Sequence, residues 1–323
     1  MNTTLFEDLY KKDLLSEVEL QAVKDAELKP VLSVHWELKT LLYLGVILLT
    51  GGLGIIVYKN MDTIGHQAVI AAIGIACLSC FFYCKKKAVG YANNKIESPN
   101  IWYDYILLLG CLLLITFLAY LQYAYNVFGT RLGMATFIPM VILFCTAYYF
   151  DHLGVLSLAV TNLATWVGIT ITPMQLLKEN DFESARLIYT GIALGLVLIG
   201  LAFISTQKNI KAHFAFTYKN FGTHLLFVAL LAGMFQYSAS HFIWFVIIAG
   251  VCWYYFYMAL KEKSFYFLVI TALYGYIALS YVVIRLLTLG KDFDVIYLGI
   301  FYFIGSSIGL IVGLIRYNKI LKK

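Results

Sequence analysis

Long apolar runs alternate with short polar segments along most of the chain. A helix that rises 1.5 Å per residue needs about 20 residues to cross a hydrocarbon core about 30 Å thick. None of the runs has the two-residue alternation of a barrel strand, and a helix satisfies its backbone polar groups internally. The pattern therefore predicts an all-helical, polytopic membrane bundle of about ten transmembrane helices. The ten runs are residues 39–58, 66–84, 101–122, 132–150, 153–173, 187–206, 222–238, 241–260, 264–287 and 295–316.

The composition agrees with this prediction and excludes other classes of protein. Of the 323 residues, 61% are hydrophobic and only 13% are charged. Soluble globular chains carry about 25% charged and about 45–50% apolar residues. A soluble core of this size could not cover so much apolar surface, so the composition excludes a cytosolic enzyme, a disordered chain and a disulfide scaffold. The basic residues are scattered among short loops, which also argues against a nucleic-acid partner. The expected environment is a lipid bilayer.

The positive charges predict an orientation. If the N-terminus is cytoplasmic, ten spans place 18 of the 24 Lys and Arg residues inside and 6 outside. Short cytoplasmic loops carry such an excess of Lys and Arg, so both termini are predicted to be cytoplasmic. The inside set is Lys11, Lys12, Lys24, Lys29, Lys39, Lys85, Lys86, Lys87, Lys95, Lys208, Lys211, Lys219, Lys261, Lys263, Arg316, Lys319, Lys322 and Lys323, and the outside set is Lys59, Arg131, Lys178, Arg186, Arg285 and Lys291.

The polar N-terminal segment is predicted to be a cytoplasmic amphipathic helical hairpin (residues 1–38), followed by a transmembrane domain (residues 39–323). Ser16 and Glu19 have the spacing of a capping box, which marks the start of the second hairpin helix. The first apolar run is too long for the core of a signal peptide, so we expect an uncleaved anchor. A hairpin this short cannot bury enough surface to stand alone. We therefore expect it to lie on the bundle or to dock a protein partner.

Small residues in two spans mark expected helix contacts. Gly305, Gly309 and Gly313 form a stripe in the last span, and Gly191 and Gly195 repeat the spacing in the sixth. Such residues let helix backbones approach closely, and we expect these contacts to lie within one bundle rather than between chains.

The six cysteines all fall within spans, where packing explains them without a disulfide or a metal. The aromatic run 253–257 is interpreted as an interfacial belt.

The candidate binding residues lie in two spans. Ionisable groups are almost absent from the spans, and where one occurs it usually has a function. Arg285 lies near the outer end of the ninth span, with Tyr281 one turn before it and able to stack on the guanidinium. In the fifth span, which is rich in polar residues, Asn162 and Trp166 share a helix face. These four residues are the candidates for binding a neutral or weakly charged solute, although anchoring of Arg285 and helix packing of Asn162 and Trp166 are the favoured interpretations.

Catalytic signatures are missing from the sequence. It contains no GxSxG elbow, HExxH motif, intramembrane aspartate pair or P-loop. The adjacent Asp151 and His152 are interpreted as a tight turn rather than a catalytic dyad, and Asp104 is expected to pair with Lys85–Lys87. We therefore expect no enzyme activity, no metal and no cofactor.

The start of the chain carries a recognisable pattern. Leu14-Leu15-Ser16-Glu17 is followed by a glycine-rich first span and by an aliphatic run that ends at Asn60. In these features residues 13–84 resemble a bacterial family of predicted membrane proteins of unknown function, although Met61 stands where that family has tryptophan. The resemblance implies an inner-membrane protein without an established activity. A vaguer likeness, in span number and orientation alone, is to the drug/metabolite transporter superfamily.

Two functional hypotheses follow from the sequence. The first is a non-enzymatic integral inner-membrane protein that acts in membrane assembly or sensing through its hairpin and bundle. The alternative is a transporter or facilitator of a neutral or weakly charged small molecule. A polar cavity that reaches the membrane midplane would favour transport, whereas a dry, packed bundle would favour the first hypothesis.

Overall fold

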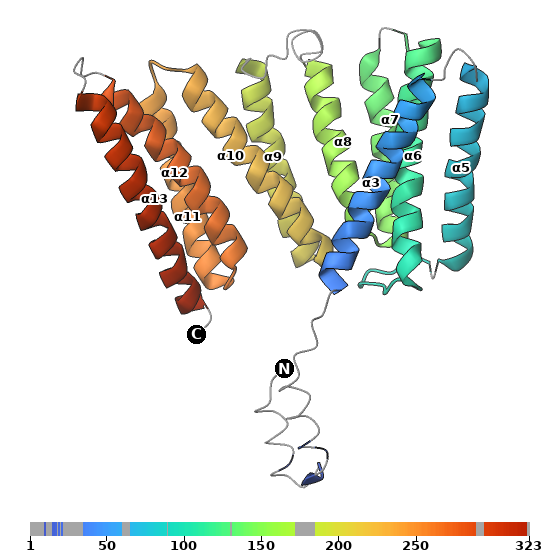
Figure 1. The fold of residues 1–323 in the computed structure, drawn as a ribbon, viewed down its shortest axis with the longest axis horizontal. Coiled ribbons are helices and arrows are strands. Elements are labelled where there is room, and N and C mark those ends of the chain that lie inside the picture. The colour runs from blue at the N-terminus through green and yellow to red at the C-terminus, as the bar shows by residue number, and fades with distance from the viewer. Residues whose placement is uncertain are drawn as a thin grey trace. The chain divides into compact units, whose positions relative to one another are not determined.

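The computed structural model describes residues 10, 15–17, 19, 21, 35–59, 65–88, 90–129, 131–171, 185–288 and 294–321. These residues are all-helical, which confirms the predicted fold class. Each of the ten apolar runs coincides with one helix, to within a few residues at most boundaries (Figure 1). The helices are α3 (His35–Lys59), α5 (His66–Lys87), α6 (Ile101–Tyr125), α7 (Leu132–Phe150), α8 (Leu153–Ile171), α9 (Ala185–Gln207), α10 (Ala215–Gln236), α11 (His241–Lys261), α12 (Phe265–Leu287) and α13 (Asp294–Leu321), with a short 3₁₀ helix, η2 (Ala212–Phe214).

The chain divides into two compact units, residues 1–63 and 64–323. Within the first unit, α3 is the long helix, and the predicted capping box forms before it. The Ser16 amide and hydroxyl donate to Glu19 Oε2 at 2.9 and 2.8 Å, and the Glu19 amide donates back to Ser16 Oγ at 3.4 Å. Of the predicted hairpin, only residues 10, 15–17, 19, 21 and 35–38 are described, and the last four of these belong to α3; Asn60 lies outside the described residues.

Nine of the described helices are long and apolar enough to cross a membrane, and α10 is not among them. Its first half carries Lys219, Asn220, Thr223 and His224. The predicted span 222–238 therefore corresponds to the apolar second half of a helix that begins earlier, at Ala215.

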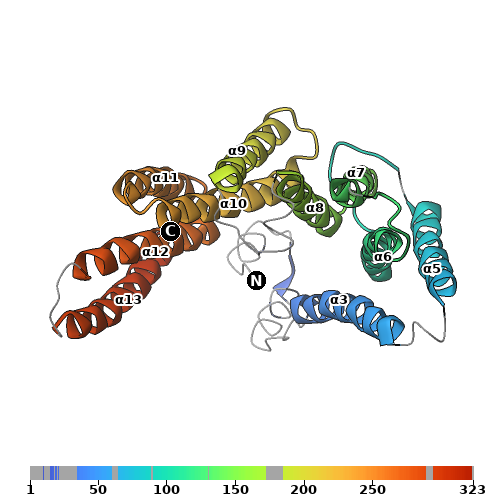
Figure 2. The same cartoon turned by 90° about the horizontal axis from the view of Figure 1, so that it is seen from above.

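Within the second unit, helices that follow one another in the chain pack side by side (Figure 2). Two clusters of buried apolar side chains result. The first joins α5 to α8 and includes Leu198 of α9 and Tyr218 of α10. The second joins α9 to α13 and includes Ile188 of α9 and Phe227 of α10. The α9–α10 pair therefore contributes to both clusters and connects the two halves of the bundle.

Glycines allow α9 and α10 to approach this closely. A Cβ added to Gly222 would lie 2.8 Å from the carbonyl oxygen of Gly195, and one added to Gly195 would lie 3.0 Å from the carbonyl oxygen of Gly222. A Cβ added to Gly191 would lie 3.1 Å from the Cβ of Ala229. The expected close contact at Gly191 and Gly195 is thus confirmed, and it lies within one chain.

The glycine stripe of the last span behaves differently. No atom lies within 4 Å of a Cβ added at Gly305, Gly309 or Gly313. The expectation that this stripe makes close contacts within the bundle is therefore wrong for the described part of the chain. The reason is that α13 does not approach its neighbour α12 along this face, and Gly309 and Gly313 line an open cavity instead.

Candidate functional site

The first pair of predicted binding residues contributes to helix packing. Asn162 is half-buried on α8, and its Nδ2 donates to the carbonyl oxygen of Leu158, one turn back on the same helix, at 3.1 Å. The Trp166 ring lies 5.2 Å from the Phe137 ring of α7. The Trp166 contact is packing between α7 and α8, whereas the Asn162 bond stays within α8.

The second predicted pair forms the expected stack. Arg285 is exposed on α12, with its Nε 3.3 Å from the Tyr281 hydroxyl and its Cζ 5.7 Å from the centre of that ring. The Tyr281 ring packs in turn against Phe235 of α10 at 4.9 Å. The structure thus brings together the members of each pair but places the pairs on different helices, α8 and α12, next to different apolar clusters.

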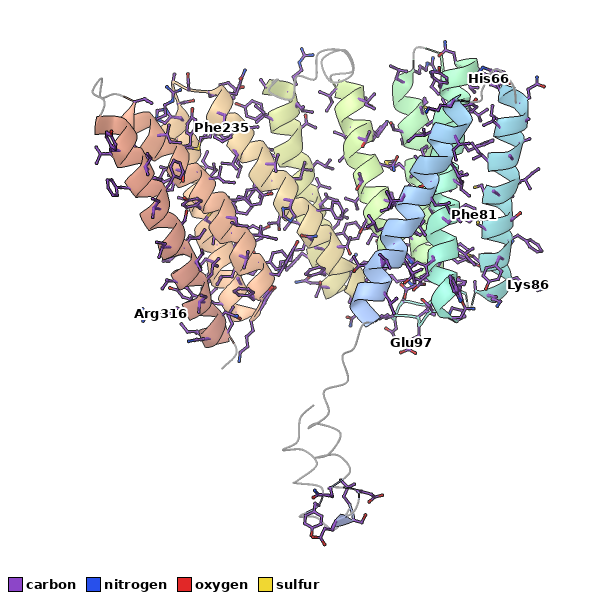
Figure 3. All side chains as sticks on the ribbon, in the orientation of Figure 1. His66, Phe81, Lys86, Glu97, Phe235 and Arg316 are labelled. Carbon is purple, nitrogen blue, oxygen red and sulfur yellow. The ribbon has the colours of Figure 1, made fainter. Side chains whose placement is uncertain are left out.

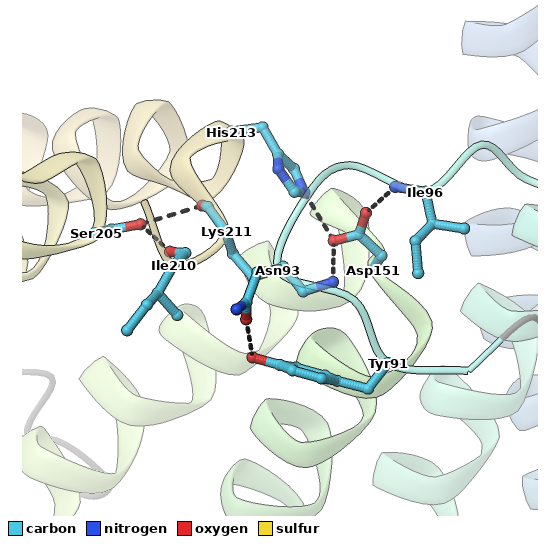
Figure 4. Close-up of polar contacts among 8 residues, drawn as sticks. All are labelled: Tyr91, Asn93, Ile96, Asp151, Ser205, Ile210, Lys211 and His213. Carbon is cyan, nitrogen blue, oxygen red and sulfur yellow. Dashed lines mark hydrogen bonds and ion pairs between the residues drawn. The ribbon is translucent and has the colours of Figure 1, made fainter. Parts of the chain in front are cut away.

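A buried ionic cluster, which the sequence reading missed, lies at one end of the bundle (Figure 4). Asp151 follows the last residue of α7 in the left-handed conformation, with φ 56°, which Asp adopts more readily than most residues. Its Oδ1 lies 2.7 Å from Lys211 Nζ and 2.7 Å from His213 Nε2. Its Oδ2 accepts the amide proton of Ile96 at 2.6 Å. We call Asp151, Lys211 and His213 the junction.

Lys211 connects the junction to two further segments. Its side chain is fully buried, and its Nζ faces the Tyr91 ring at 5.1 Å. Its backbone amide donates to the Asn93 carbonyl oxygen at 3.1 Å. Its own carbonyl oxygen accepts from the Ser205 hydroxyl at 3.1 Å. The connections α5–α6, α7–α8 and α9–α10 are therefore tied together, and we call their described residues 88, 90–100, 151–152 and 208–214 the loop platform.

The electrostatics of the junction favour a charged carboxylate. Burial raises the pKa of Asp151, but hydrogen bonds from Lys211, the Ile96 amide and His213 outweigh it and hold the pKa below its ordinary value of 3.8. Removing one partner of a buried ion pair is costly because a charge remains without compensation. Both carboxylate oxygens of Asp151 accept from these donors. The junction therefore holds the three connections together.

This lowered pKa predicts a dependence of stability on pH. A carboxyl group whose pKa is lower in the folded state stabilises the fold above its unfolded-state pKa, and the contribution is lost as the pH falls through the folded-state pKa. We expect the difference in melting temperature between the wild type and Asp151→Asn to be constant near neutral pH and to shrink below pH 3.8. Thermal unfolding followed at a series of pH values measures it. A difference that does not change down to the acid limit would contradict the assignment.

The neighbouring acidic residue has other partners than expected. Asp104 accepts from the Ser98 hydroxyl at 2.5 Å and lies 3.8 Å from His152 Nε2. The described residues show no ion pair between Asp104 and Lys85–Lys87, so that expectation is wrong, because the nearer loop groups occupy the carboxylate. His152 Nδ1 accepts the Val155 amide proton at 3.1 Å and so caps the start of α8. Asp151 and His152 therefore form a turn with separate partners, as interpreted from the sequence.

The polar first half of α10 is satisfied by a second hydrogen-bonded group. His224 Nδ1 lies 2.8 Å from the Tyr274 hydroxyl, and Nε2 lies 3.3 Å from the Tyr266 hydroxyl. Tyr266 donates its proton to Asn220 Oδ1 at 2.6 Å. Because the amide oxygen can only accept, the network assigns the proton of neutral His224 to Nε2, and Tyr274 donates to Nδ1.

Two more contacts complete this polar face. Lys219 Nζ pairs with Glu262 Oε2 at 2.6 Å, and the Thr223 and Tyr255 hydroxyl oxygens lie 2.8 Å apart. The spacing of Lys219, Asn220, Thr223 and His224 places them on one helix face, a signal from which the cluster could have been found. In the described part of the chain, no group of three or more His, Cys, Asp or Glu side chains is placed to hold a metal ion.

Comparison with known proteins identifies one family. The model of a family described as "Predicted membrane protein (DUF2157)" matches residues 7–156. No curated protein and no solved structure matches the chain. The matched residues contain the predicted hairpin and the helices α3 to α7, and they include Asp151 of the junction. The family match confirms the resemblance seen in the first residues of the sequence, and with nine candidate spans the chain is a polytopic membrane protein.

Proposed function

We propose a non-enzymatic role in membrane assembly or sensing at the bacterial inner membrane for this chain, whose residues 7–156 match the model of the DUF2157 family of predicted membrane proteins. In this role the loop platform, on the cytoplasmic side, presents a fixed surface to a protein partner. The observation that carries the proposal is the junction, because a buried ion pair fixes three connections that would otherwise be separate loops.

The charge of the platform indicates the kind of partner. Lys85, Lys86, Lys87, Lys95 and Lys208 are exposed at this end of the bundle. In Figure 3, Lys86 and the acidic Glu97 lie at the same end, opposite to His66 and Phe235. A basic surface speeds the encounter with an acidic partner and selects against basic ones. The partner is therefore an acidic soluble protein or domain.

The polar groups of the bundle support a non-enzymatic role. Asp151 and Lys211, which in another setting could act as base and acid, bind each other. His224 is bonded to tyrosines on both ring nitrogens. The alternative, transport of a neutral or weakly charged solute, needs Asn162, Trp166, Tyr281 and Arg285 to act together. Their placement on α8 and α12 does not favour it.

In-cell photo-crosslinking tests the proposal. A photoreactive residue at Asn94, exposed on the platform, is expected to give a protein adduct, whereas one at Leu78, exposed midway along α5, gives none. Lys95→Gln with Lys208→Gln is expected to lower the adduct yield about tenfold, since each basic residue contributes about 1 kcal/mol or less at a surface. Recovery of no protein adduct from Asn94 would overturn the docking role.

The N-terminal hairpin is the second element of the proposal. Deletion of residues 1–30 is expected to lower recovery of the crosslinked partner while leaving membrane insertion unchanged, because α3 remains as the first anchor. A photoreactive residue in place of Tyr10 reports directly whether the hairpin contacts the partner. A partner recovered equally with and without residues 1–30, and with no adduct at Tyr10, would remove the hairpin from the proposal.

A further inference from the structure

An open cavity of about 530 Å³ lies between α11, α12 and α13. Its volume falls within the range of about 300–1,000 Å³ that is usual for small-molecule sites in proteins. All three helices that line it are candidate membrane spans. The cavity therefore lies at the depth of the hydrocarbon core. Its lining includes Ile248 and Phe256 of α11, Leu268 and Leu279 of α12, and Leu310 and Leu314 of α13.

Two polar groups of the cavity wall, on Thr271 and Cys252, are already bonded within the bundle. The Thr271 hydroxyl donates to the Phe267 carbonyl oxygen at 2.7 Å, and the Cys252 thiol donates to the Thr271 carbonyl oxygen at 3.8 Å. Apart from the polar atoms of Trp253 and Tyr317, the residues that line the cavity therefore present carbon to its occupant. A polar solute would lose hydrogen bonds on entering such a site, whereas a hydrocarbon chain would not.

The cavity is open because the residues at three positions of its wall are glycines, which have no side chain. Gly309 and Gly313 of α13 both line it, and a Cβ added at either would meet no atom within 4 Å. Across the cavity, a Cβ added at Gly275 of α12 would meet only the Cys252 sulfur, at 3.3 Å. Larger residues at these positions would fill the space, so an occupant lies along the glycine face of α13 in place of side chains.

One end of the cavity is marked by aromatic and basic residues. The Phe256 ring of α11 and the Tyr317 ring of α13 pack edge to face at 5.2 Å, and both residues line the cavity. Lys261 is in the last turn of α11, and Arg316 and Lys319 are in the last turns of α13, all three exposed. Figure 3 shows Arg316 at the same end of the bundle as Lys86. Basic groups beside an apolar cleft between membrane helices match an anionic lipid headgroup.

From this arrangement we infer that the cavity between α11, α12 and α13 binds one acyl chain of an anionic phospholipid, whose headgroup contacts the basic residues at the ends of α11 and α13. The chain fills the apolar cavity along Gly309 and Gly313, and its phosphate lies near Lys261 and Arg316. The site is separate from the loop platform, so its test does not depend on a protein partner.

Native mass spectrometry of the purified, delipidated full-length protein tests the inference, with phosphatidylglycerol and phosphatidylcholine as the two probes. We expect one phosphatidylglycerol to be retained in preference to phosphatidylcholine. Gly309→Leu with Gly313→Leu is expected to lower this retention about tenfold, since the added side chains occupy the space of the lipid chain. Gly305→Leu is the matched control, because it lies on the same stripe, has the same open surroundings and does not line the cavity.

The headgroup contact is tested separately. Lys261→Gln and Arg316→Gln are each expected to weaken phosphatidylglycerol binding about fivefold and to leave phosphatidylcholine binding unchanged. Equal retention of both lipids by the wild type would overturn the inference. So would unchanged retention in the cavity-filling variant. If instead the filled cavity converts a dimer to a monomer in light scattering, the occupant is a second copy of the chain and the lipid assignment is wrong.

Discussion

Asp151→Asn should lower the free energy of unfolding by about 3–5 kcal/mol, the usual cost of removing one partner from a buried ion pair. Asn has nearly the size of Asp and also adopts the left-handed conformation found here at φ 56°. Backbone strain therefore does not contribute. The cost arises because Lys211, whose side chain is 0% exposed, keeps its charge while its carboxylate is lost.

A double-mutant cycle separates the ion pair from other effects of the substitution. Lys211→Met removes the buried charge and keeps the apolar stem between the Tyr91 and Phe214 rings. The double variant Asp151→Asn/Lys211→Met is expected to be more stable than Asp151→Asn alone. Denaturant unfolding in detergent measures each step. Asp104→Asn, which alters a 20% exposed carboxylate in the first turn of α6, serves as control and is expected to cost about 1 kcal/mol. A loss below 1 kcal/mol for Asp151→Asn would show that the junction is not needed for the fold.

The sequence was sufficient to locate the helices but not the junction, and there is a physical reason for the difference. Membrane spans are local features, because the length of an apolar run alone determines whether it can cross the bilayer. The junction is not local, because Asp151 and Lys211 are 60 residues apart and Ile96 is 55 residues before Asp151. In the sequence, Asp151 and His152 are simply two adjacent polar residues of one turn. Only the tertiary fold gives them different partners.

The start of α10 illustrates a second limit of sequence reading. Hydropathy scores the transfer of an isolated segment into lipid, and Lys219 and His224 count heavily against it. In the bundle, Glu262 pairs with Lys219, and Tyr266 and Tyr274 of α12 bond to His224. Tyr255, interpreted from the sequence as part of an interfacial belt, is only 2% exposed, and its hydroxyl is hydrogen-bonded to that of Thr223 at 2.8 Å. The belt interpretation is therefore wrong for Tyr255, while Trp253 and Tyr257 of the same run are exposed.

Glycine spacing predicted one helix contact correctly and another wrongly. The i, i+4 repeat of Gly191 and Gly195 correctly indicated a close helix contact, because close approach requires small residues wherever it occurs. The same repeat at Gly305, Gly309 and Gly313 makes no close contact, and its last two glycines line an open cavity instead. The spacing thus shows that another group can approach the glycine face of a helix closely. Whether a helix, a lipid or nothing lies against that face depends on the tertiary fold.

Gly222→Ala provides the clearest test of the α9–α10 contact. The added Cβ would lie 2.8 Å from the Gly195 carbonyl oxygen, 2.9 Å from Ile199 Cγ1 and 3.1 Å from the Ile199 amide nitrogen. Two of these three atoms are backbone and cannot move without separating the helices. We expect a loss of about 1–3 kcal/mol in the free energy of unfolding, as for other overpacked cores.

A matched substitution on α9 serves as the control for this effect. A Cβ at Gly200 would meet no atom within 4 Å, so Gly200→Ala is expected to stabilise the protein by about 0.5–1 kcal/mol through helix propensity alone. Gly195→Ala, which faces Gly222, is expected to resemble Gly222→Ala. Because α9 and α10 contribute to both apolar clusters, separating them should loosen the two halves together. A single unfolding transition at lower denaturant is therefore expected, and equal stability of Gly222→Ala and Gly200→Ala would contradict the contact.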